Sequence, residues 1–229
     1  MDTAGMNTVK PSYLPHHIQW TESKTAAQLA NELARTIAQQ LATALELQPR
    51  ASLAVSGGRT PILMLQLLSQ QQIDWQRIDI TLADERWVDE HDIASNGALV
   101  RTNLIQNKAH AATFFPLYTG AETAKAGEES CQTQLNNMHW PLDVLVLGMG
   151  NDGHTASLFP GQTDYDTELN AVVVFHPDTQ QPRISITAPV ISNAKRVSYL
   201  VLGASKQKMV KRCLAELSDV DSTDIDSAD

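Results

Sequence analysis

The sequence of 229 residues lacks the features that mark several large classes of protein. It has only two cysteines, Cys131 and Cys213, which lie far apart and in no metal-binding spacing, so neither a disulfide framework nor a thiolate metal site is expected. No run approaches the ~20 apolar residues that a membrane-spanning helix needs. The first residues, 1–17, contain neither the basic nor the apolar segment of a signal peptide. These absences predict a reduced cytoplasmic protein that does not enter a membrane.

The chain also has no excess of basic residues. Its 17 Lys and Arg stand against 26 Asp and Glu, a net charge of -9, which argues against a nucleic-acid partner. Six of the acidic residues lie in 216–229, which holds no Lys or Arg, so the remaining 20 leave residues 1–215 with a net charge of only -3. Because this last segment has little apolar surface to bury, we expect a mobile acidic tail at 216–229 behind a single domain at 1–215.

What the sequence does contain is an alternation of helical and strand patterns. A helical stripe at 22–47 is followed by the apolar run 51–56, a turn and a second helical pattern. Further apolar runs lie at 78–84, 113–118, 143–148, 171–175, 183–187 and 196–203, with helical patterns at 95–105, 121–137 and 205–217. Such alternation indicates parallel strand–helix–strand units. We therefore expect an α/β fold, a three-layer α/β/α domain with a mostly parallel sheet.

The loops that follow the strands are the expected places for a site, because ligands bind beyond the carboxyl ends of parallel strands. The loop Ser-Gly-Gly-Arg-Thr at 56–60 joins a strand to a helix. Its glycines let backbone N–H groups approach a ligand, the helix start favours an anion, and Arg59 adds a charged donor. The loop is either a phosphate-binding cradle, which we favour, or a plain tight turn.

Two familiar motifs are matched only in part. The stretch 54–58 is similar to the nucleophile elbow of serine hydrolases, but Pro61 sets the helix entry several residues after the serine. The G-x-G-x-x-G at 148–153 follows a strand, but Pro160 breaks the chain before the helix that a dinucleotide site requires. No HExxH-like pattern suggests zinc. We therefore expect neither a nucleotide cofactor nor a metal.

Charged side chains follow three other strands. Asp84, Glu85 and Arg86 end one strand and are either a solvated loop or part of a site. In the Gly-rich loop at 147–161, Asp152 lies two residues before His154, where a carboxylate can hold the tautomer or the charged form of an imidazole. This makes His154 the best catalytic candidate. Arg183 and Lys206 lie near loop ends and are either ordinary surface bases or part of a phosphate clamp.

Taken together, SGGRTP, DERWV, the SN at 95–96 and GMGNDGHTASLFPG resemble the 6-phosphogluconolactonase family, and RISIT and GASK match in the same order. The resemblance covers roughly residues 20–215. It implies a Rossmann-like α/β/α fold and a catalytic domain at 1–215. It also implies hydrolysis of 6-phospho-D-glucono-1,5-lactone to 6-phospho-D-gluconate in the oxidative pentose phosphate pathway, without metal or cofactor.

The same resemblance implies roles for individual residues. His154 would activate water, with Asp152 and Arg86 assisting. The residues implied to bind the substrate or its phosphate are Ser56, Gly57, Gly58, Arg59, Thr60, Asp84, Glu85, Asn96, Gly150, Arg183 and Lys206. The chemistry suits these residues, because a δ-lactone is an activated ester that needs only a base on a water and a donor for the oxyanion.

Three other functions are weighed against this one. Amino-sugar phosphate deaminases and isomerases of the same fold group carry a Glu before the Pro-Gly of this loop, where this chain has Phe159. A non-catalytic sugar-phosphate-binding module needs no poised Asp-Gly-His and usually carries a DNA-binding segment, for which the stretch before the first helix is too short. A serine hydrolase would use Ser56.

We expect a monomer, and leave open which group donates to the oxyanion, whether Asp152 orients His154 or contacts substrate, and what the acidic tail does.

Overall fold

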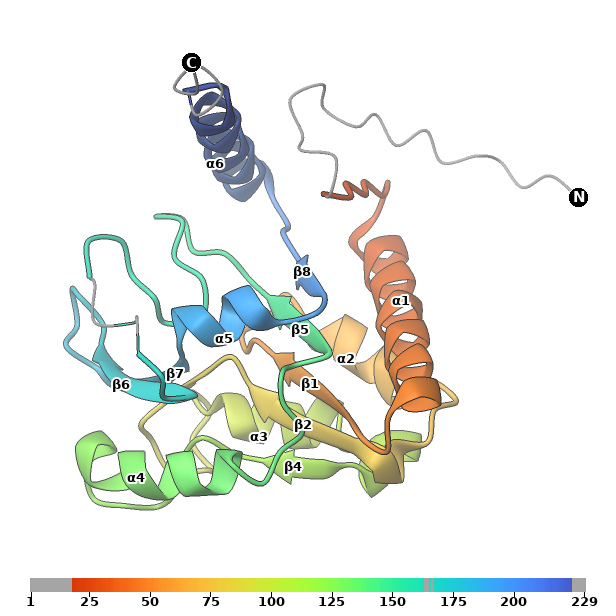
Figure 1. Ribbon diagram of the computed structural model, residues 1–229, viewed down its shortest axis with the longest axis vertical. Helices are drawn as coiled ribbons and strands as arrows, with labels where there is room; N and C mark the ends of the chain where they lie inside the picture. The colour runs from red at the N-terminus through yellow and green to blue at the C-terminus, as the bar shows by residue number, and fades with distance from the viewer. Residues whose placement is uncertain (1–17, 163–164, 166, 224–229) are drawn as a thin grey trace, which may run out of the picture.

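The structure, a computed structural model, describes residues 18–162, 165 and 167–223. Its central sheet has five parallel strands in the order β4-β2-β1-β5-β8 (Figure 1). Their bounds are β1 Ala51–Val55, β2 Ile78–Leu82, β4 Thr113–Phe115, β5 Val144–Leu147 and β8 Val197–Tyr199. Strands β1, β2 and β5 are buried along their whole length, as their continuous apolar runs predict for a sheet covered on both faces. The expected mostly parallel α/β fold is thereby confirmed.

A second, smaller sheet departs from the sequence-based expectation. Strands β3 (Asp84–Arg86), β7 (Pro182–Ile186) and β6 (Ala171–Phe175) form an antiparallel sheet in the order β3-β7-β6. We expected 78–84 to be one strand and placed 171–175 and 183–187 in the parallel sheet; the structure corrects both. The short connection between β6 and β7 permits only antiparallel pairing.

Ala83 forms backbone hydrogen bonds with both sheets. Its N–H donates to the carbonyl of Val55 in the parallel sheet (2.9 Å), while its own carbonyl accepts from the N–H of Ile186 in the antiparallel sheet (2.9 Å). The chain therefore changes sheets within one residue. As a result, Asp84 and its neighbours lie directly beyond the carboxyl end of β2.

The helices follow the predicted order. Their bounds are α1 Ala26–Leu47, α2 Ile62–Ser69, α3 Asn96–Asn103, α4 Ala124–Leu135, α5 Ala188–Asn193 and α6 Ala204–Thr223, with 3-10 turns η1 Trp75–Arg77 and η2 Asn107–Ala111. Helix α1 packs on α2 and β1, α2 packs on α3, and α4 covers β6 and β7. The buried stripe of α1 includes Ile37 and Leu41, each fully inaccessible, and such a side chain contributes about 1.5–3 kcal/mol on burial.

Helix ends agree with the sequence at some positions and differ at others. Ser95, a residue type that favours the N-cap position, caps α3 by accepting from the N–H of Ala98 (3.0 Å). The Thr60-Pro61 pair predicts Thr60 as N-cap and Pro61 as first residue of α2, but the helix begins one residue later, with Pro61 as its N-cap and no capping side chain among the described residues. Helix α6 is longer than the predicted 205–217 and continues through residues 216–223, while 224–229 lie outside the described residues.

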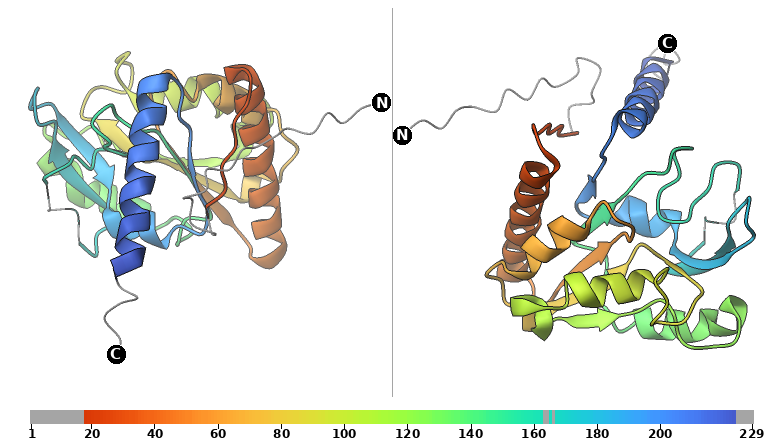
Figure 2. Two further views of the ribbon diagram at one scale, coloured as in Figure 1. Left: turned by 90° about the horizontal axis from the view of Figure 1, so that it is seen from above. Right: turned by 180° about the vertical axis from the view of Figure 1, so that it is seen from behind.

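Helix α6 stands apart from both sheets. Figure 2 shows it reaching away beyond β8, whereas α1 lies along the parallel sheet. Within the described residues, no helix combines the length and the apolar content that a bilayer crossing requires.

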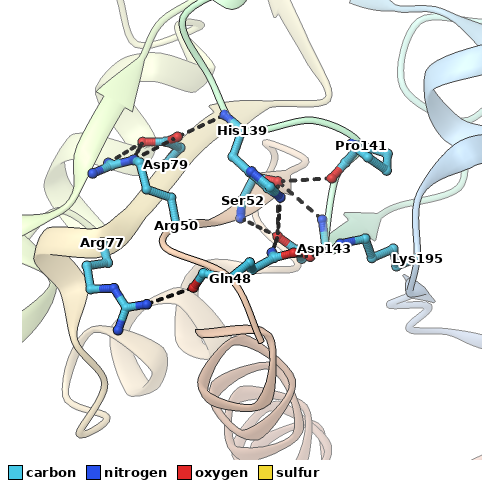
Figure 3. Close-up of polar contacts among 9 residues, drawn as sticks. All are labelled: Gln48, Arg50, Ser52, Arg77, Asp79, His139, Pro141, Asp143 and Lys195. Carbon is cyan, nitrogen blue, oxygen red and sulfur yellow. Dashed lines mark hydrogen bonds and ion pairs between the residues drawn. The ribbon is translucent and has the colours of Figure 1, made fainter. Parts of the chain in front are cut away.

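A cluster of polar and charged side chains lies at the amino-terminal end of the parallel strands, which is the end opposite the loops of interest (Figure 3). The Asp143 carboxylate accepts from the backbone N–H of Ser52 (2.8 Å) and from Nζ of Lys195 (2.7 Å). Asp79 accepts from Nε of Arg50 (3.1 Å). The other members of the cluster are Gln48, Arg77, His139 and Pro141. Because both carboxylates are almost fully buried, their partners are needed to offset the cost of removing charge from water.

We expect Asp143→Asn to lower the free energy of unfolding by about 2–4 kcal/mol, because the amide loses the charge that holds Lys195 and one acceptor oxygen. Urea denaturation measures the change. The matched control is Asp74→Asn at the exposed Arg77–Asp74 pair, which should change stability by less than about 0.5 kcal/mol. Equal effects of the two substitutions would contradict a special role for the buried network.

Candidate functional site

A cleft of about 430 Å³ opens where the loops after the strands converge. The residues that line it are Ser56, Gly57, Gly58, Arg59, Thr60, Pro61, Asp84, Arg86, Asn96, Val146, Leu147, Gly148, Met149, Gly150, Asn151, His154, Ala156, Arg183, Leu200 and Lys206. They come from the loops after β1 and β5, from both sheets, and from the starts of α3 and α6. A second hollow of about 440 Å³ lies near the end of α1 and contains none of the expected site residues.

The Ser-Gly-Gly loop is held against the start of α3 and against the loop after β5. A Cβ on Gly57 would lie only 1.8 Å from Oδ1 of Asn96, so only glycine permits this approach. The Ser56 hydroxyl accepts from the N–H of Gly148 (3.3 Å), and its backbone N–H donates to Val146 (3.0 Å). Because α2 starts only at Ile62, the loop lacks the immediate helix entry of a nucleophile elbow.

Asp84 faces the cleft and joins three segments. Its Oδ2 accepts from the hydroxyl of Ser157 (2.6 Å) and lies 3.7 Å from Nη1 of Arg183. Its backbone carbonyl accepts from Nδ2 of Asn96 (2.8 Å). The carboxylate is therefore a rigid wall of the cleft, fixed by a serine, an arginine and an asparagine.

Glu85 points away from the cleft and is 1% exposed. Its carboxylate accepts from the N–H groups of Asn96 (2.7 Å) and Gly97 (2.6 Å) and from the hydroxyl of Ser95 (3.1 Å). Burial raises the pKa of Glu85, and the hydrogen bonds offset only part of that rise. We expected Glu85 among the substrate-binding residues, but it does not line the cleft, because its oxygens are used to anchor the start of α3.

Two arginines meet across the antiparallel sheet. Arg86 of β3 pairs in register with Arg183 of β7. Nη1 of Arg86 donates to the carbonyl of Ala94 (2.6 Å), and Nη1 of Arg183 donates to the hydroxyl of Ser157 (3.3 Å). The buried Nε atoms of both have no hydrogen-bond partner among the described residues. Like charges directly opposite on a sheet repel, so an anion bound beside them would relieve the repulsion and use the free donors.

The electrostatics of the cleft differ from those of the whole chain. Among the described residues that line it, Arg59, Arg86, Arg183 and Lys206 stand against a single carboxylate, Asp84. Burial lowers the pKa of Arg183, Asp84 raises it, and Arg86 lowers it further. The cleft is therefore locally positive in a chain of net charge -9, which suits a small anionic ligand.

His154 and Asp152 form a hydrogen-bonded pair at the mouth of the cleft. Nδ1 of His154 lies 2.6 Å from Oδ1 of Asp152. Burial raises the pKa of Asp152, but the backbone and side-chain hydrogen bonds from His154 outweigh it, so the pKa is lowered overall. An ionised carboxylate only accepts, so Nδ1 carries the proton and a neutral imidazole keeps Nε2 as an acceptor.

Glycine is required beside this pair. A Cβ on Gly150 would lie 2.3 Å from the His154 ring and 2.5 Å from Asp152. Asp152 itself does not line the cleft, and its side chain contacts Nδ1 of His154, which does.

The structure thus brings the expected site residues together around the cleft, except that Asp152 is half exposed beside His154 and Glu85 is buried at the start of α3. Sequence reasoning gave no role to Ser157, which is fully buried and joins Asp84 to Arg183. A serine in a Gly-rich loop carries no signal that separates it from a solvated turn residue. Among the described residues, no group of three or more His, Cys, Asp or Glu side chains is arranged to hold a metal ion.

Comparison with known proteins bears on this site. Residues 24–224 match the family model described as glucosamine-6-phosphate isomerases/6-phosphogluconolactonase. The chain is 39% identical over 197 residues to the 6-phosphogluconolactonase of Pseudomonas aeruginosa, covering 83% of each protein. It is similar to the crystal structure of a 6-phosphogluconolactonase from Shewanella baltica, with 40% identity, a TM-score of 0.81 and 84% of each chain covered. A monomeric glucosamine-6-phosphate deaminase, 19% identical with a TM-score of 0.69 and 85% and 86% covered, shares the fold.

The buried Glu85 predicts a pH dependence of stability. Its pKa in the folded protein lies above the 4.5 of an exposed glutamate, so the stabilisation from proton uptake is complete below that value and is lost as the pH rises through the folded-state pKa. Unfolding free energies from ~pH 4 to ~pH 7 should therefore fall for the wild type relative to Glu85→Gln. Glu90→Gln, at an exposed carboxylate, serves as the control. A stability of the wild type that instead rises with pH relative to Glu85→Gln would contradict the assignment.

Proposed function

Because the chain belongs to the family of glucosamine-6-phosphate isomerases and 6-phosphogluconolactonases, we propose that its cleft hydrolyses 6-phospho-D-glucono-1,5-lactone to 6-phospho-D-gluconate, a step of the oxidative pentose phosphate pathway. The observation that carries the proposal is the His154–Asp152 pair at the mouth of a locally positive cleft. It combines an imidazole that can act as a base with cationic groups for a sugar phosphate.

In the proposed reaction, Nε2 of His154 takes a proton from a water molecule whose oxygen attacks the lactone carbonyl carbon. Asp152 holds the Nδ1–H and stabilises the imidazolium that forms. When the tetrahedral intermediate collapses, the bond from that carbon to the ring oxygen breaks and the imidazolium returns the proton to the departing oxygen. Arg86 or a backbone N–H of the Gly-rich loop donates to the oxyanion. No covalent intermediate is needed.

The other cations of the cleft suit the phosphate. Arg59, Arg183 and Lys206 supply charge, and the N–H groups of Gly57 and Gly58 supply backbone donors ahead of α2. Asp84 and Asn96 offer polar groups for the sugar hydroxyls. Binding energy from the remote phosphate then orients the lactone carbonyl toward His154.

The runner-up function is an amino-sugar phosphate deaminase or isomerase, since the family name covers both activities. Phe159 stands where the deaminase pattern has a glutamate, and it is 2% exposed. It can neither give nor take a proton, which argues against ring-opening chemistry there. A non-catalytic sugar-phosphate-binding module would need the cations but not the His154–Asp152 pair.

We further propose that the protein acts as a cytoplasmic monomer with no nucleic-acid partner and that residues 1–215 form the catalytic domain. The acidic balance of the chain and its two free cysteines support this proposal. Burial and the charge of Glu128 raise the pKa of Cys131 to about 12, so this thiol stays protonated and unreactive.

We expect His154→Ala to lower kcat by about 10²- to 10⁴-fold, because the general base is lost. The assay follows the loss of freshly generated 6-phosphogluconolactone above its spontaneous hydrolysis. His91→Ala, at an exposed histidine, is the matched control and should retain full activity. Full activity of the His154 variant, or no acceleration by the wild type, would rule out the proposed chemistry.

A second assay separates the two activities of the family. Incubation with glucosamine 6-phosphate should release no ammonia, because Phe159 leaves no carboxyl group at that position. An enzymatic ammonia assay on the wild type measures this directly. Steady ammonia release at enzyme concentrations that hydrolyse the lactone would favour the deaminase function instead.

A further inference from the structure

One buried aromatic ring contacts two of the side chains that line the cleft. Phe159 does not line the cleft, yet its ring centroid is 4.7 Å from that of His154, with the planes tilted by 51°. The guanidinium carbon of Arg183 lies 5.6 Å from the same ring centroid. His176 packs edge-on against the ring at 5.0 Å. The Phe159 side chain therefore contacts both the proposed base, His154, and Arg183, which is proposed to bind the phosphate.

Phe159 is itself firmly held. Its backbone N–H donates to the hydroxyl of Tyr165 (2.9 Å). The preceding turn is closed by a bond from the N–H of Leu158 to the carbonyl of Thr155 (2.9 Å), and Ser157 is bonded through its N–H to the hydroxyl of Ser185 (3.1 Å). The backbone that carries the ring is therefore anchored at Phe159 and at the two residues before it, so the ring can fix the orientation of the side chains that it contacts.

His154 needs a second constraint besides Asp152. The Asp152 side chain is half exposed, so a hydrogen bond to it fixes one edge of the imidazole but not the direction its plane faces. Contact with a ring behind the imidazole supplies the missing constraint, and tilted aromatic pairs at this separation attract each other.

The contact of Arg183 with the Phe159 ring leaves the N–H donors of the guanidinium free to bind other groups. Nη1 is engaged by Ser157 and lies near Asp84, while the buried Nε has no partner among the described residues. The face of an aromatic ring attracts a cation without accepting its hydrogen bonds in the plane of the guanidinium. Arg183 is thus oriented while its Nε remains available to an anion.

We propose that Phe159 is a positioning residue that sets the separation between the His154 base and the Arg183 cation. The inference rests on the proposed function of these two residues. The lactone carbonyl and the phosphate lie at a fixed spacing in the substrate, so both groups must be correctly placed at once, and a misplacement of about 1 Å costs roughly 10²-fold in rate.

The test compares Phe159→Leu, which keeps apolar volume but removes the ring face, with Phe159→Tyr, which retains the ring. We expect Phe159→Leu to lower kcat/KM by roughly 5- to 50-fold, with a lower kcat from the displaced imidazole and a higher KM from the displaced guanidinium. Phe159→Tyr should recover most of both parameters. Unchanged kcat and KM in a folded Phe159→Leu variant would overturn the proposal.

Val172→Ala is the matched control, since Val172 is buried in a small apolar cluster with Tyr165, the residue whose hydroxyl accepts from the N–H of Phe159, and does not line the cleft. It should lower stability while leaving kcat and KM at wild-type values well below the unfolding temperature. If Val172→Ala reproduces the kinetic losses of Phe159→Leu, the effect is general loosening and the proposal fails.

A measurement on the wild type keeps the proposal testable even if Phe159→Leu does not fold. NMR should show cross-relaxation between the imidazole protons of His154, assigned by their absence in His154→Ala, and the ring protons of Phe159. Absence of that signal would overturn the proposal. The failures are distinguishable: an active His154→Ala enzyme defeats the proposed function, whereas an inactive one beside an unimpaired Phe159→Leu enzyme defeats only the role of Phe159.

Discussion

The site depends on two adjacent buried carboxylates, Asp84 and Glu85, that point to opposite sides of β3. Glu85 holds the start of α3 and so places Asn96 against Gly57, while Asp84 holds Ser157 and Arg183 at the wall of the cleft. Because Ala83 bonds to both sheets, this pair lies where the chain changes from one to the other. Carboxylates buried so deeply persist only with several donors each, and those donors are the segments that build the cleft.

The charged groups at the two ends of the parallel strands differ in how completely they are paired. At one end, Asp79 and Asp143 are matched by Arg50, Lys195 and neighbouring donors, which leaves little unused hydrogen-bonding capacity on the carboxylates (Figure 3). At the other end, cations outnumber carboxylates, and two guanidinium Nε atoms remain without partners among the described residues. The carboxylates of the first arrangement find their partners within the fold, whereas the second leaves donors free for the anionic ligand that we propose.

The sequence predicted the parallel strands and the main pair of the site, but not the antiparallel sheet or the orientation of Glu85. The apolar runs and turn glycines predicted β1, β2, β5 and the loops after them, because burial on both faces leaves a continuous apolar signature. The spacing of Asp152 and His154 predicted their pairing. The antiparallel sheet was missed, since short strands carry no mark of which neighbour they pair with. The direction of Glu85 was missed because alternation along a strand shows that neighbours face opposite ways, not which of them faces a ligand.

The net charge shows the same division. Composition determined that the chain is acidic, which argued against a nucleic-acid partner. The positions of the charged residues determined that most of the excess negative charge lies in 216–229. Local patterns determined the order of strands and helices, because hydrophobic periodicity is a property of neighbouring residues. Only the tertiary structure decided that Arg59, Arg86, Arg183 and Lys206 share one cleft and that Phe159 lies behind His154. Those contacts join residues far apart in the chain, and it is the register of the strands and the closure of two sheets at Ala83 that bring them within reach.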